Sequence, residues 1–371
     1  MSFVRIATEE AFATAELFDC YRRILEKKSV DDPGFYSLWG HYLTDRGPRA
    51  SDIRRKLLDL GEERLRDMDS CGIARQVVSL TAPGVQILDA ATAASIATLA
   101  NDQLAEAVAR HPDRFTGLAA MAPQDPRRAA SEIERAVSGL GFRGVILNSH
   151  THGEYLDDHK FWEIFEVVEQ LDVPIYLHPN TPSPRLIGPM LDSGLDGAIY
   201  GFAVETGLHL LRIIVSGVFD RFSKVRIVVG HLGEALPFWL FRLDFMHDAM
   251  VKAGRHAGIK RLAKRPSEYL RENVWITTSG MAWEPAIMFV RSVIGAGHVM
   301  YAMDYPYQFV PAEVKVTDDL PITDAEKTAF YQSNAESVFS LKSVHSPPMG
   351  LDYGGTNSVG LPSTNNRNGE A

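Results

Sequence analysis

Short apolar runs alternate with helical patterns along most of this 371-residue chain, and this repeat constrains the fold more than any other feature. The runs have few polar interruptions, as expected for parallel strands that are buried on both faces. Eight of them occur in order, namely Val4–Thr8, Gln76–Leu80, Phe115–Ala119, Gly144–Asn148, Pro174–His178, Val225–Gly230, Val274–Thr278 and Val299–Met303. Helical patterns lie between most of them, over Ala94–Arg110, Ala129–Leu140, Phe161–Leu171, Gly207–Phe219 and Pro285–Ile294. The repeat predicts an α/β protein, and a (β/α)8 TIM-type barrel rather than a doubly wound sheet.

Two connections in this repeat are long. Gly34–Arg49 combines aromatic residues with two arginines, and we expect it to form a loop folded over the barrel mouth. Thr181–Gly201 directly follows the fifth predicted strand and is rich in proline and glycine, which also predicts a loop. Barrel enzymes build their substrate pockets from such βα loops, so we expect long βα-loop insertions at the C-terminal face.

Composition predicts one catalytic domain over residues 1–342 and a low-complexity C-terminal tail over residues 343–371, which is rich in Ser, Asn, Gly and Pro. The net charge of −9 argues against a nucleic-acid-binding surface. No apolar run approaches the ~18–20 residues that cross a bilayer, and the N-terminus lacks a signal-peptide pattern. Two cysteines, Cys20 and Cys71, are too few for a disulfide framework. We expect a cytoplasmic protein that binds neither nucleic acid nor membrane.

Residues that can carry chemistry follow the first, fifth, sixth and eighth predicted strands. The four segments are Thr8-Glu9-Glu10-Ala11, Leu177-His178-Pro179, Gly230-His231-Leu232-Gly233-Glu234 and Met303-Asp304-Tyr305-Pro306. Each acidic or imidazole side chain has a structural explanation when taken alone, such as capping a turn or filling a hydrogen-bonded position. Together they meet at one end of a parallel barrel, because the strands share a direction. The combination predicts a metal site at the barrel mouth.

Glu9 and Glu10 are neighbours at the end of the first predicted strand. Side chains alternate along a strand, so only one of the two can point into the barrel. A carboxylate at the buried end of a strand is costly unless it meets a cation or hydrogen-bond donors. The pair therefore predicts one carboxylate at the site and a second one elsewhere.

Several longer stretches resemble the amidohydrolase superfamily, in the branch that includes aminocarboxymuconate-semialdehyde decarboxylase and the aromatic-acid decarboxylases. Within that branch the chain is most similar to the carboxyvanillate decarboxylases. The stretches that carry the resemblance are Arg5–Thr14, Ser37–Gly40, Ala122–Pro126, Gly194–Ala198, Gly201–Phe202, Gly230–Pro237 and Tyr301–Gln308. They extend over the whole predicted catalytic domain.

The resemblance implies that Glu9, His178 and Asp304 hold a metal ion. Many members of the branch have a His two residues after the first ligand, where this chain has Ala11. The missing side chain leaves one more coordination position open to substrate or water. Two carboxylates and one imidazole suit Mn²⁺, which the resemblance also implies, although Zn²⁺ accepts the same ligand types. No organic cofactor is expected.

The activity implied by the resemblance is the non-oxidative decarboxylation of an ortho-hydroxy aromatic acid. The expected substrate is 5-carboxyvanillate, an intermediate of lignin-derived aromatic catabolism, which would give vanillate and CO₂. The reaction requires a proton at the ring carbon that bears the carboxylate. Asp304 is the first candidate for the proton donor. His231, steadied by Glu234, is the alternative donor or the group that supplies Asp304 with its proton.

A substrate with carboxylate, hydroxyl and methoxy groups requires basic and aromatic contacts. Five candidates for these contacts are Arg49, Arg242, Tyr307, Phe202 and Trp39. The resemblance also implies a homodimer or homotetramer, in which Thr181–Gly201 or Phe238–Ala257 could form the contact between subunits.

Two other functions are compatible with the same residues. A metal-dependent lactonase or hydratase of aromatic catabolism could use the same ligands, although Ala11 and the carboxyvanillate-type stretches favour decarboxylation. A catalytically silent scaffold is the second alternative. The presence of all four strand-end residues, Glu9, His178, His231 and Asp304, argues against it.

Overall fold

Eight parallel strands form the centre of the molecule in the computed structural model, which describes residues 3–343. The strands are β1 (Arg5–Phe12), β2 (Ile73–Leu80), β3 (Phe115–Gly117), β4 (Val145–Asn148), β5 (Ile175–His178), β6 (Ile227–Val229), β7 (Val274–Thr277) and β8 (Val299–Met300). Strands β1–β3 pair in order, as do β4–β8. Parallel bridges from Ala119 to Val145 and from Glu10 to Tyr305 join the two sets, so the pairing runs in a closed order. All eight strands predicted from the sequence are confirmed.

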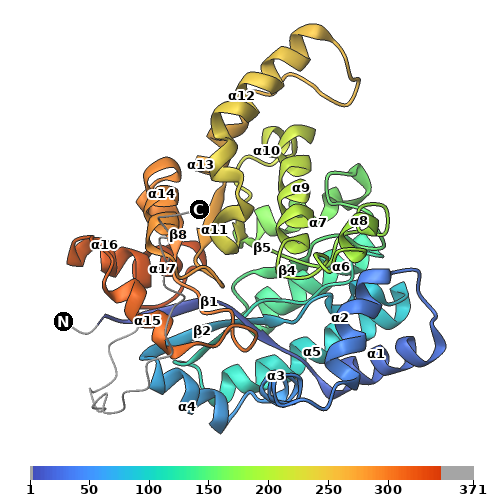
Figure 1. Ribbon diagram of the computed structural model, residues 1–371, viewed down its shortest axis with the longest axis vertical. Coiled ribbons are helices and arrows are strands. Elements are labelled where there is room, and N and C mark those ends of the chain that lie inside the picture. The colour runs from blue at the N-terminus through green and yellow to red at the C-terminus, as the bar shows by residue number, and fades with distance from the viewer. Residues whose placement is uncertain (1–2, 344–371) are drawn as a thin grey trace, which may run out of the picture.

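Helices surround the strands, and α12 extends beyond the body of the molecule at the top of the view (Figure 1). Their bounds are α1 (Ala15–Lys27), α2 (Pro33–Thr44), α3 (Pro48–Leu58), α4 (Glu62–Ser70), α5 (Ala90–Arg110), α6 (Pro126–Glu134), α7 (Trp162–Gln170), α8 (Gly188–Leu191), α9 (Gly201–Ser216), α10 (Val218–Arg221), α11 (His231–Glu234), α12 (Leu236–Ala253), α13 (Pro266–Glu272), α14 (Glu284–Ile294), α15 (Pro311–Asp318), α16 (Asp324–Thr328) and α17 (Asn334–Val338). The five predicted helical patterns coincide with α5, α6, α7, α9 and α14. Apart from residue 343, the predicted tail lies outside the described residues.

The segment Gly34–Arg49, predicted as a loop, is mostly helical. It forms most of α2 and the first residues of α3. The Asp32 side chain accepts a hydrogen bond from the Phe35 N–H (2.9 Å), and Pro33 occupies the first turn, so local sequence specifies a helix start here. The prediction was wrong because the aromatic residues were assigned to a loop although this capping signal precedes them.

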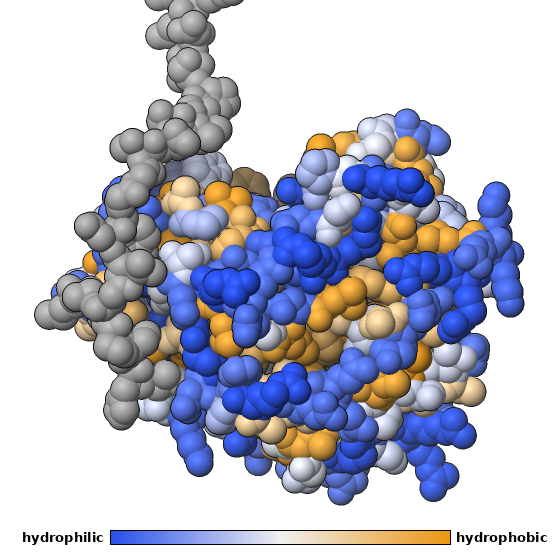
Figure 2. Space-filling model, turned by 90° about the horizontal axis from the view of Figure 1, so that it is seen from below, coloured by the Kyte–Doolittle hydropathy of each residue, from blue (hydrophilic) through white to orange (hydrophobic). Residues whose placement is uncertain are grey.

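The core lies between the strands and the surrounding helices. Every residue of β2 is buried, as expected for a strand covered on both faces. Hydrophilic side chains surround smaller hydrophobic patches on the face seen in Figure 2. Among the described helices, none combines the length and the apolar composition that crossing a bilayer requires.

A buried polar cluster ties α9 to the loops after β4 and β5. The Glu205 carboxylate accepts hydrogen bonds from the Ser149 hydroxyl and from the Ser183 backbone N–H, both at 3.0 Å. His209, one turn later on α9, accepts the Leu156 N–H at Nε2 (2.9 Å), so its Nδ1 carries the proton and faces the Ser149 hydroxyl (3.3 Å). Glu205 and His209 are fully buried. The cluster therefore fixes α9 with respect to two strand ends.

The chain after β6 makes a turn with left-handed backbone. Five successive residues, from His231 to Ala235, have φ angles between 50° and 79°. Glycine adopts this conformation freely at Gly233, whereas each of the other four residues is strained by roughly 1–2 kcal/mol. The turn brings His231 Nδ1 to 2.9 Å from Glu234 Oε1. Strained backbone of this kind is concentrated at functional sites.

The neutral state of His209 makes folding stability depend on pH. Burial lowers the pKa of His209 to about 3 from the ordinary value of 6.5 that applies to the unfolded chain. The unfolded state therefore binds more protons between these values, and stability falls as the pH drops below about 6.5. Between pH 7 and pH 5, His209 should lower the free energy of unfolding of the wild-type protein by about 2 kcal/mol. The variant His209→Gln, whose amide can make both hydrogen bonds, should lack this part of the decrease. Urea denaturation measures this, with His256→Gln at an exposed histidine as the control that keeps the wild-type pH dependence.

Ala235 is the exposed last residue of the left-handed turn. Glycine avoids the strain of roughly 1–2 kcal/mol at an entropic cost of about 0.5–1 kcal/mol, so Ala235→Gly should raise the free energy of unfolding by about 0.5–1 kcal/mol. The matched change Ala109→Gly, at an exposed position of the right-handed helix α5, should lower it by about 0.5–1 kcal/mol. Urea denaturation of both variants checks the signs. Destabilisation by both changes would contradict the left-handed turn.

Candidate metal centre and active site

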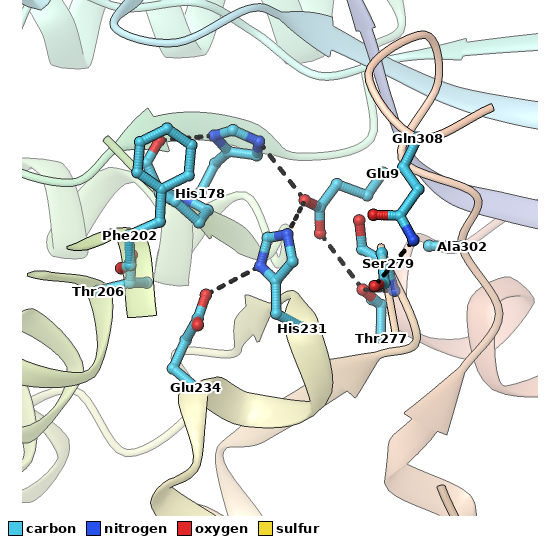
Figure 3. A network of polar contacts seen from close by, with 12 residues as sticks. Glu9, His178, Phe202, Thr206, His231, Glu234, Thr277, Ser279, Ala302 and Gln308 are labelled. Carbon is cyan, nitrogen blue, oxygen red and sulfur yellow. Dashed lines mark hydrogen bonds and ion pairs between the residues drawn. The ribbon is translucent and has the colours of Figure 1, made fainter. Parts of the chain in front are cut away.

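A cavity of about 170 Å³ opens where β5, β6 and β8 end. In the part of the chain that the structure describes, it is lined by Leu38, Tyr42, Arg49, Ala82, His178, Ala198, Phe202, His231, Asp304, Tyr307 and Gln308. The two histidines and Asp304 come from three of the four predicted strand ends. Glu9, from the fourth, lies immediately behind them (Figure 3).

Glu9 lies within β1, and its carboxylate is buried with its two oxygens in different surroundings. Oε2 accepts hydrogen bonds from the Tyr176 hydroxyl and from the Thr277 hydroxyl (3.3 Å). Oε1 has no hydrogen-bond partner among the described residues and lies 3.4 Å from His178 Nε2 and 3.7 Å from His231 Nε2. One carboxylate oxygen is therefore held, and the other is directed at two imidazoles.

His178 and His231 present the same ring nitrogen to this oxygen. The backbone carbonyl of Pro179 accepts a hydrogen bond from the protonated Nδ1 of His178 (2.8 Å). Nε2 is then the nitrogen with a free lone pair, and it faces Glu9. Burial lowers the pKa of His178, which favours the neutral imidazole that binds metals. His231 instead directs Nδ1 at the Glu234 carboxylate.

Glycines allow the close approach of the groups around Glu9. A Cβ atom at Gly230 would overlap the Glu9 carboxylate, with its Cδ at 3.0 Å. A Cβ atom at Gly280 would lie 3.3 Å from Asp304 Oδ2 and 3.5 Å from His231 Cδ2. The side chains of Asp304 and His231 thus face the same small space above Gly280, beside Glu9.

The donor set fits a divalent cation. A buried carboxylate oxygen without a partner and an imidazole nitrogen with a free lone pair are the ligand types that Mn²⁺ and Zn²⁺ bind. Across residues 3–343, no group of three His, Cys, Asp or Glu side chains is drawn together closely enough to ligate one ion as it stands. Ligation by the three residues predicted from the sequence, Glu9, His178 and Asp304, would require their side chains to move toward a common point.

The charges of the site shift the pKa values of Asp304 and His231 in the same direction. Burial, together with the negative charge of Glu9, raises the pKa of Asp304 to about 8. Burial alone would lower the pKa of His231, but the charges of Glu234 and Glu9 outweigh it and raise the value to about 10. Both groups therefore hold protons readily in the protein alone. A divalent cation beside Asp304 would favour its ionised form instead.

Of the predicted substrate-binding residues, Arg49, Tyr307 and Phe202 line the cavity. Trp39 is fully buried behind it, where its indole N–H donates to the carbonyl of Ala82 (3.0 Å). Arg242 is exposed on α12 and lines an apolar groove formed mainly by α9 and α12. The structure therefore does not bring Trp39 or Arg242 to this cavity within the single chain.

Sequence reasoning missed two groups of residues around the site. Tyr176 and Thr277 hold Glu9 by hydrogen bonds. Tyr176 precedes His178 by two positions on β5, so both side chains lie on one face of the strand, and this spacing could have identified Tyr176 from the sequence. Tyr42 packs edge-on against Tyr307 with ring centroids 5.7 Å apart. No signal in the sequence identified Tyr42.

Comparisons with known proteins show which family the chain resembles over most of its length. The family model described as Amidohydrolase matches residues 40–341. The structure of 5-carboxyvanillate decarboxylase from Novosphingobium aromaticivorans, complexed with manganese and 4-hydroxy-3-methoxy-5-nitrobenzoic acid, is 50% identical with a TM-score of 0.90 and covers 91% of this chain and 96% of that chain. The enzyme of the same name from Sphingomonas paucimobilis is 40% identical with a TM-score of 0.85, over 92% of this chain and 100% of that chain.

A more distant relative has a similar activity in its name. Gamma-resorcylate decarboxylase from Polaromonas sp. is 34% identical over 352 residues, which are 91% of this chain and 98% of the relative. The resemblance that the sequence stretches predicted is therefore confirmed. The chain belongs to the amidohydrolase family.

Proposed function

We propose that this protein is a manganese-dependent decarboxylase of ortho-hydroxy aromatic acids and that it converts 5-carboxyvanillate to vanillate and CO₂. The observation that carries the proposal is the buried, unpartnered Glu9 Oε1 beside His178 and His231, at the wall of a cavity with basic and aromatic side chains. Relatives that are 50% and 40% identical carry the name of this activity, and one of them holds manganese and a nitrobenzoic acid.

Glu9, His178 and Asp304 are the proposed metal ligands. When held there, Mn²⁺ would supply positive charge that favours binding of the phenolic and carboxylate oxygens of the substrate, and it would stabilise negative charge on the ring. Zn²⁺ remains a chemically suitable alternative. The hydroxyls of Tyr176 and Thr277 hold one Glu9 oxygen and leave the other for ligation.

Proton delivery is assigned first to Asp304, because it lines the cavity. A divalent cation beside Asp304 favours its ionised form, so this role requires substrate binding to raise its proton affinity. His231 is the alternative donor or the group that returns a proton to Asp304. Its Nδ1 is fixed by Glu234, so the proton on Nε2 is the one directed toward the cavity. No redox step is required, because the proton replaces CO₂ on the ring carbon.

The substrate is held by side chains that line the cavity. Phe202 provides an aromatic wall, and Arg49 provides a cation for a carboxylate. The Arg49 guanidinium also donates to the Tyr307 carbonyl (3.0 Å), and the Tyr307 hydroxyl lies 2.6 Å from the Thr81 hydroxyl. These contacts fix the positions of Arg49 and Tyr307 at the cavity. Substrate binding by Arg242 and Trp39 stays a prediction.

The proposed architecture is a (β/α)8 TIM-type barrel with one catalytic domain over residues 1–342 and long βα insertions at its C-terminal face. The closed parallel pairing and the family match over residues 40–341 support it. A homodimer or homotetramer is part of the proposal, with Phe238–Ala257 or Thr181–Gly201 at the contact. Within Phe238–Ala257, the exposed large aromatic residues are Phe238, Trp239, Phe241 and Phe245. The cytoplasmic location stays a prediction.

A substrate panel tests the reaction. Manganese-loaded protein is incubated with 5-carboxyvanillate, other ortho-hydroxybenzoates and a pyrone lactone, while CO₂ and products are measured. We expect vanillate and CO₂ from 5-carboxyvanillate, with slower or no turnover of the other acids. Hydrolysis of the lactone without CO₂ release from any acid would favour the hydrolase alternative. A protein that binds no metal and turns over none of the compounds would favour the scaffold alternative.

Two substitutions separate metal binding from proton transfer. Asp304→Asn should abolish turnover and weaken Mn²⁺ binding, because it removes a ligand and the first proton donor together. His231→Gln should lower turnover by roughly 10²–10⁴-fold while Mn²⁺ affinity stays near the wild-type value, since His231 is not a proposed ligand. Calorimetric Mn²⁺ titration and CO₂ release measure the two effects. Asp319→Asn, at an exposed carboxylate paired with Lys315, is the control. Full activity of Asp304→Asn would exclude both of its assigned roles.

A further inference from the structure

Glu10 is the buried carboxylate that the proposed reaction leaves unused. It follows Glu9 directly, has no exposed surface and is turned away from the two histidines of the site. Its Oε1 accepts the backbone N–H of Met303 (3.0 Å), and its Oε2 accepts the backbone N–H of Tyr305 (3.1 Å). These two residues flank Asp304 on either side. One carboxylate thus holds the chain immediately before and after a proposed metal ligand.

The backbone of Asp304 needs such support. Its φ angle is +66°, in the left-handed region that strains residues with side chains by roughly 1–2 kcal/mol. A strained residue keeps its conformation only where the surrounding contacts outweigh the strain. Besides the two bonds to Glu10, the Tyr305 carbonyl accepts the Ala11 N–H (2.7 Å). Consecutive residues of β1 therefore contact the segment around Asp304.

Strand β1 gains an extra residue just before Glu10. Ala7 pairs with Gln76 and Glu10 pairs with Val78, so three steps along β1 match two steps along β2. An irregularity of this kind changes the direction in which the following side chains point and is often found beside active sites. This irregularity in β1 accounts for the different contacts of two adjacent buried carboxylates. Glu9 faces imidazoles, and Glu10 accepts hydrogen bonds from backbone N–H groups.

A buried cation balances the charge of Glu10. The Gln76 amide lies between the two groups, with Nε2 3.4 Å from Glu10 Oε2 and with Oε1 accepting from Arg64 Nη1 (3.3 Å). Arg64 is fully buried, and its guanidinium lies 4.6 Å from the ring centroid of Tyr305. The same guanidinium donates to the Ala11 carbonyl (2.6 Å). Arg64 thus contacts both β1 and the residue that follows Asp304.

We propose that Glu10 is a positioning residue that fixes the backbone of Asp304, so that the Asp304 carboxylate faces Glu9 and His231. The role in metal binding rests on the proposed function, whereas the role in holding the backbone does not. A carboxylate is required because both of its oxygens accept hydrogen bonds. The amide of a glutamine would direct its NH₂ group at one of the two N–H donors and leave that donor unpaired.

Glu10→Gln is the decisive variant, and Glu132→Gln is its matched control. Glu132 on α6 is a largely buried carboxylate that accepts hydrogen bonds from Thr98, Asn101 and Arg135, outside the site. Both changes remove one acceptor oxygen from a satisfied carboxylate, so both lower global stability. Only Glu10→Gln removes an acceptor from the backbone around Asp304.

Hydrogen exchange of the metal-free proteins gives the first readout. We expect at least one of the Met303 and Tyr305 amides, the one left without an acceptor, to exchange at least ten-fold faster in Glu10→Gln than in wild type, while strand β5 is unchanged relative to Glu132→Gln. Equal exchange of the 303–305 segment in wild type and Glu10→Gln would overturn the proposal. If Glu10→Gln does not fold, wild-type protein decides: slow exchange of both amides supports the proposal, and exchange as fast as in an unstructured peptide overturns it.

Mn²⁺ titration by calorimetry gives the second readout. Loss of a residue that supports a metal ligand weakens metal affinity by roughly 10–100-fold, and we expect a change of this size for Glu10→Gln and less than two-fold for Glu132→Gln. Wild-type affinity in folded Glu10→Gln would overturn the role in metal binding. Wild-type protein that binds no Mn²⁺ would refute the proposed metal centre instead, and the exchange rates would still decide whether Glu10 holds the backbone of Asp304.

Discussion

The burial of carboxylates at the ends of the strands is the constraint on which the rest of this site depends. An isolated buried carboxylate is strongly unfavourable, so each one must be matched by hydrogen-bond donors or by a cation. Glu10, Glu205 and Glu234 are matched by backbone N–H groups, hydroxyls or an imidazole. Glu9 is matched at one oxygen only. The exception supports the proposed position of the metal ion beside Glu9.

The satisfied carboxylates determine where the reactive groups lie. Glu205 fixes α9, which carries Phe202 into the cavity one turn earlier. Glu234 fixes the ring of His231, and Glu10 holds the backbone on both sides of Asp304. Hydrogen bonds of three buried carboxylates therefore help to position Phe202, His231 and Asp304, which line the cavity. Such contacts are directional, which suits a site in which a ring must be held with one carbon facing a proton donor.

The sequence predicted the elements that depend on regular patterns. The eight strands and the strand-end positions of Glu9, His178, His231 and Asp304 follow from apolar runs and from the common direction of parallel strands. The helices within Gly34–Arg49 were missed, although the cap at Asp32 precedes them. The left-handed turn and the position of Trp39 could not be predicted, because they depend on contacts between residues that are distant in sequence. Arg242 was predicted to bind substrate from its spacing along a helix. Such spacing does not indicate which face of the helix lies toward the cavity.

His231 and Asp304, the two residues assigned to proton transfer, both have left-handed backbone and follow β6 and β8, which are separated by β7 in the closed sheet. The strain in each has to be balanced by contacts elsewhere, and the supports differ. The turn of His231 is supported by its bond to Glu234 and by Gly230 and Gly233. Asp304 is supported from β1, the strand that also carries Glu9. Glu9 of β1 is the first proposed ligand, and the adjacent residue Glu10 holds the backbone of the last one, Asp304. Any shift of this strand would therefore move Glu9 and Asp304 together and preserve the distance between them.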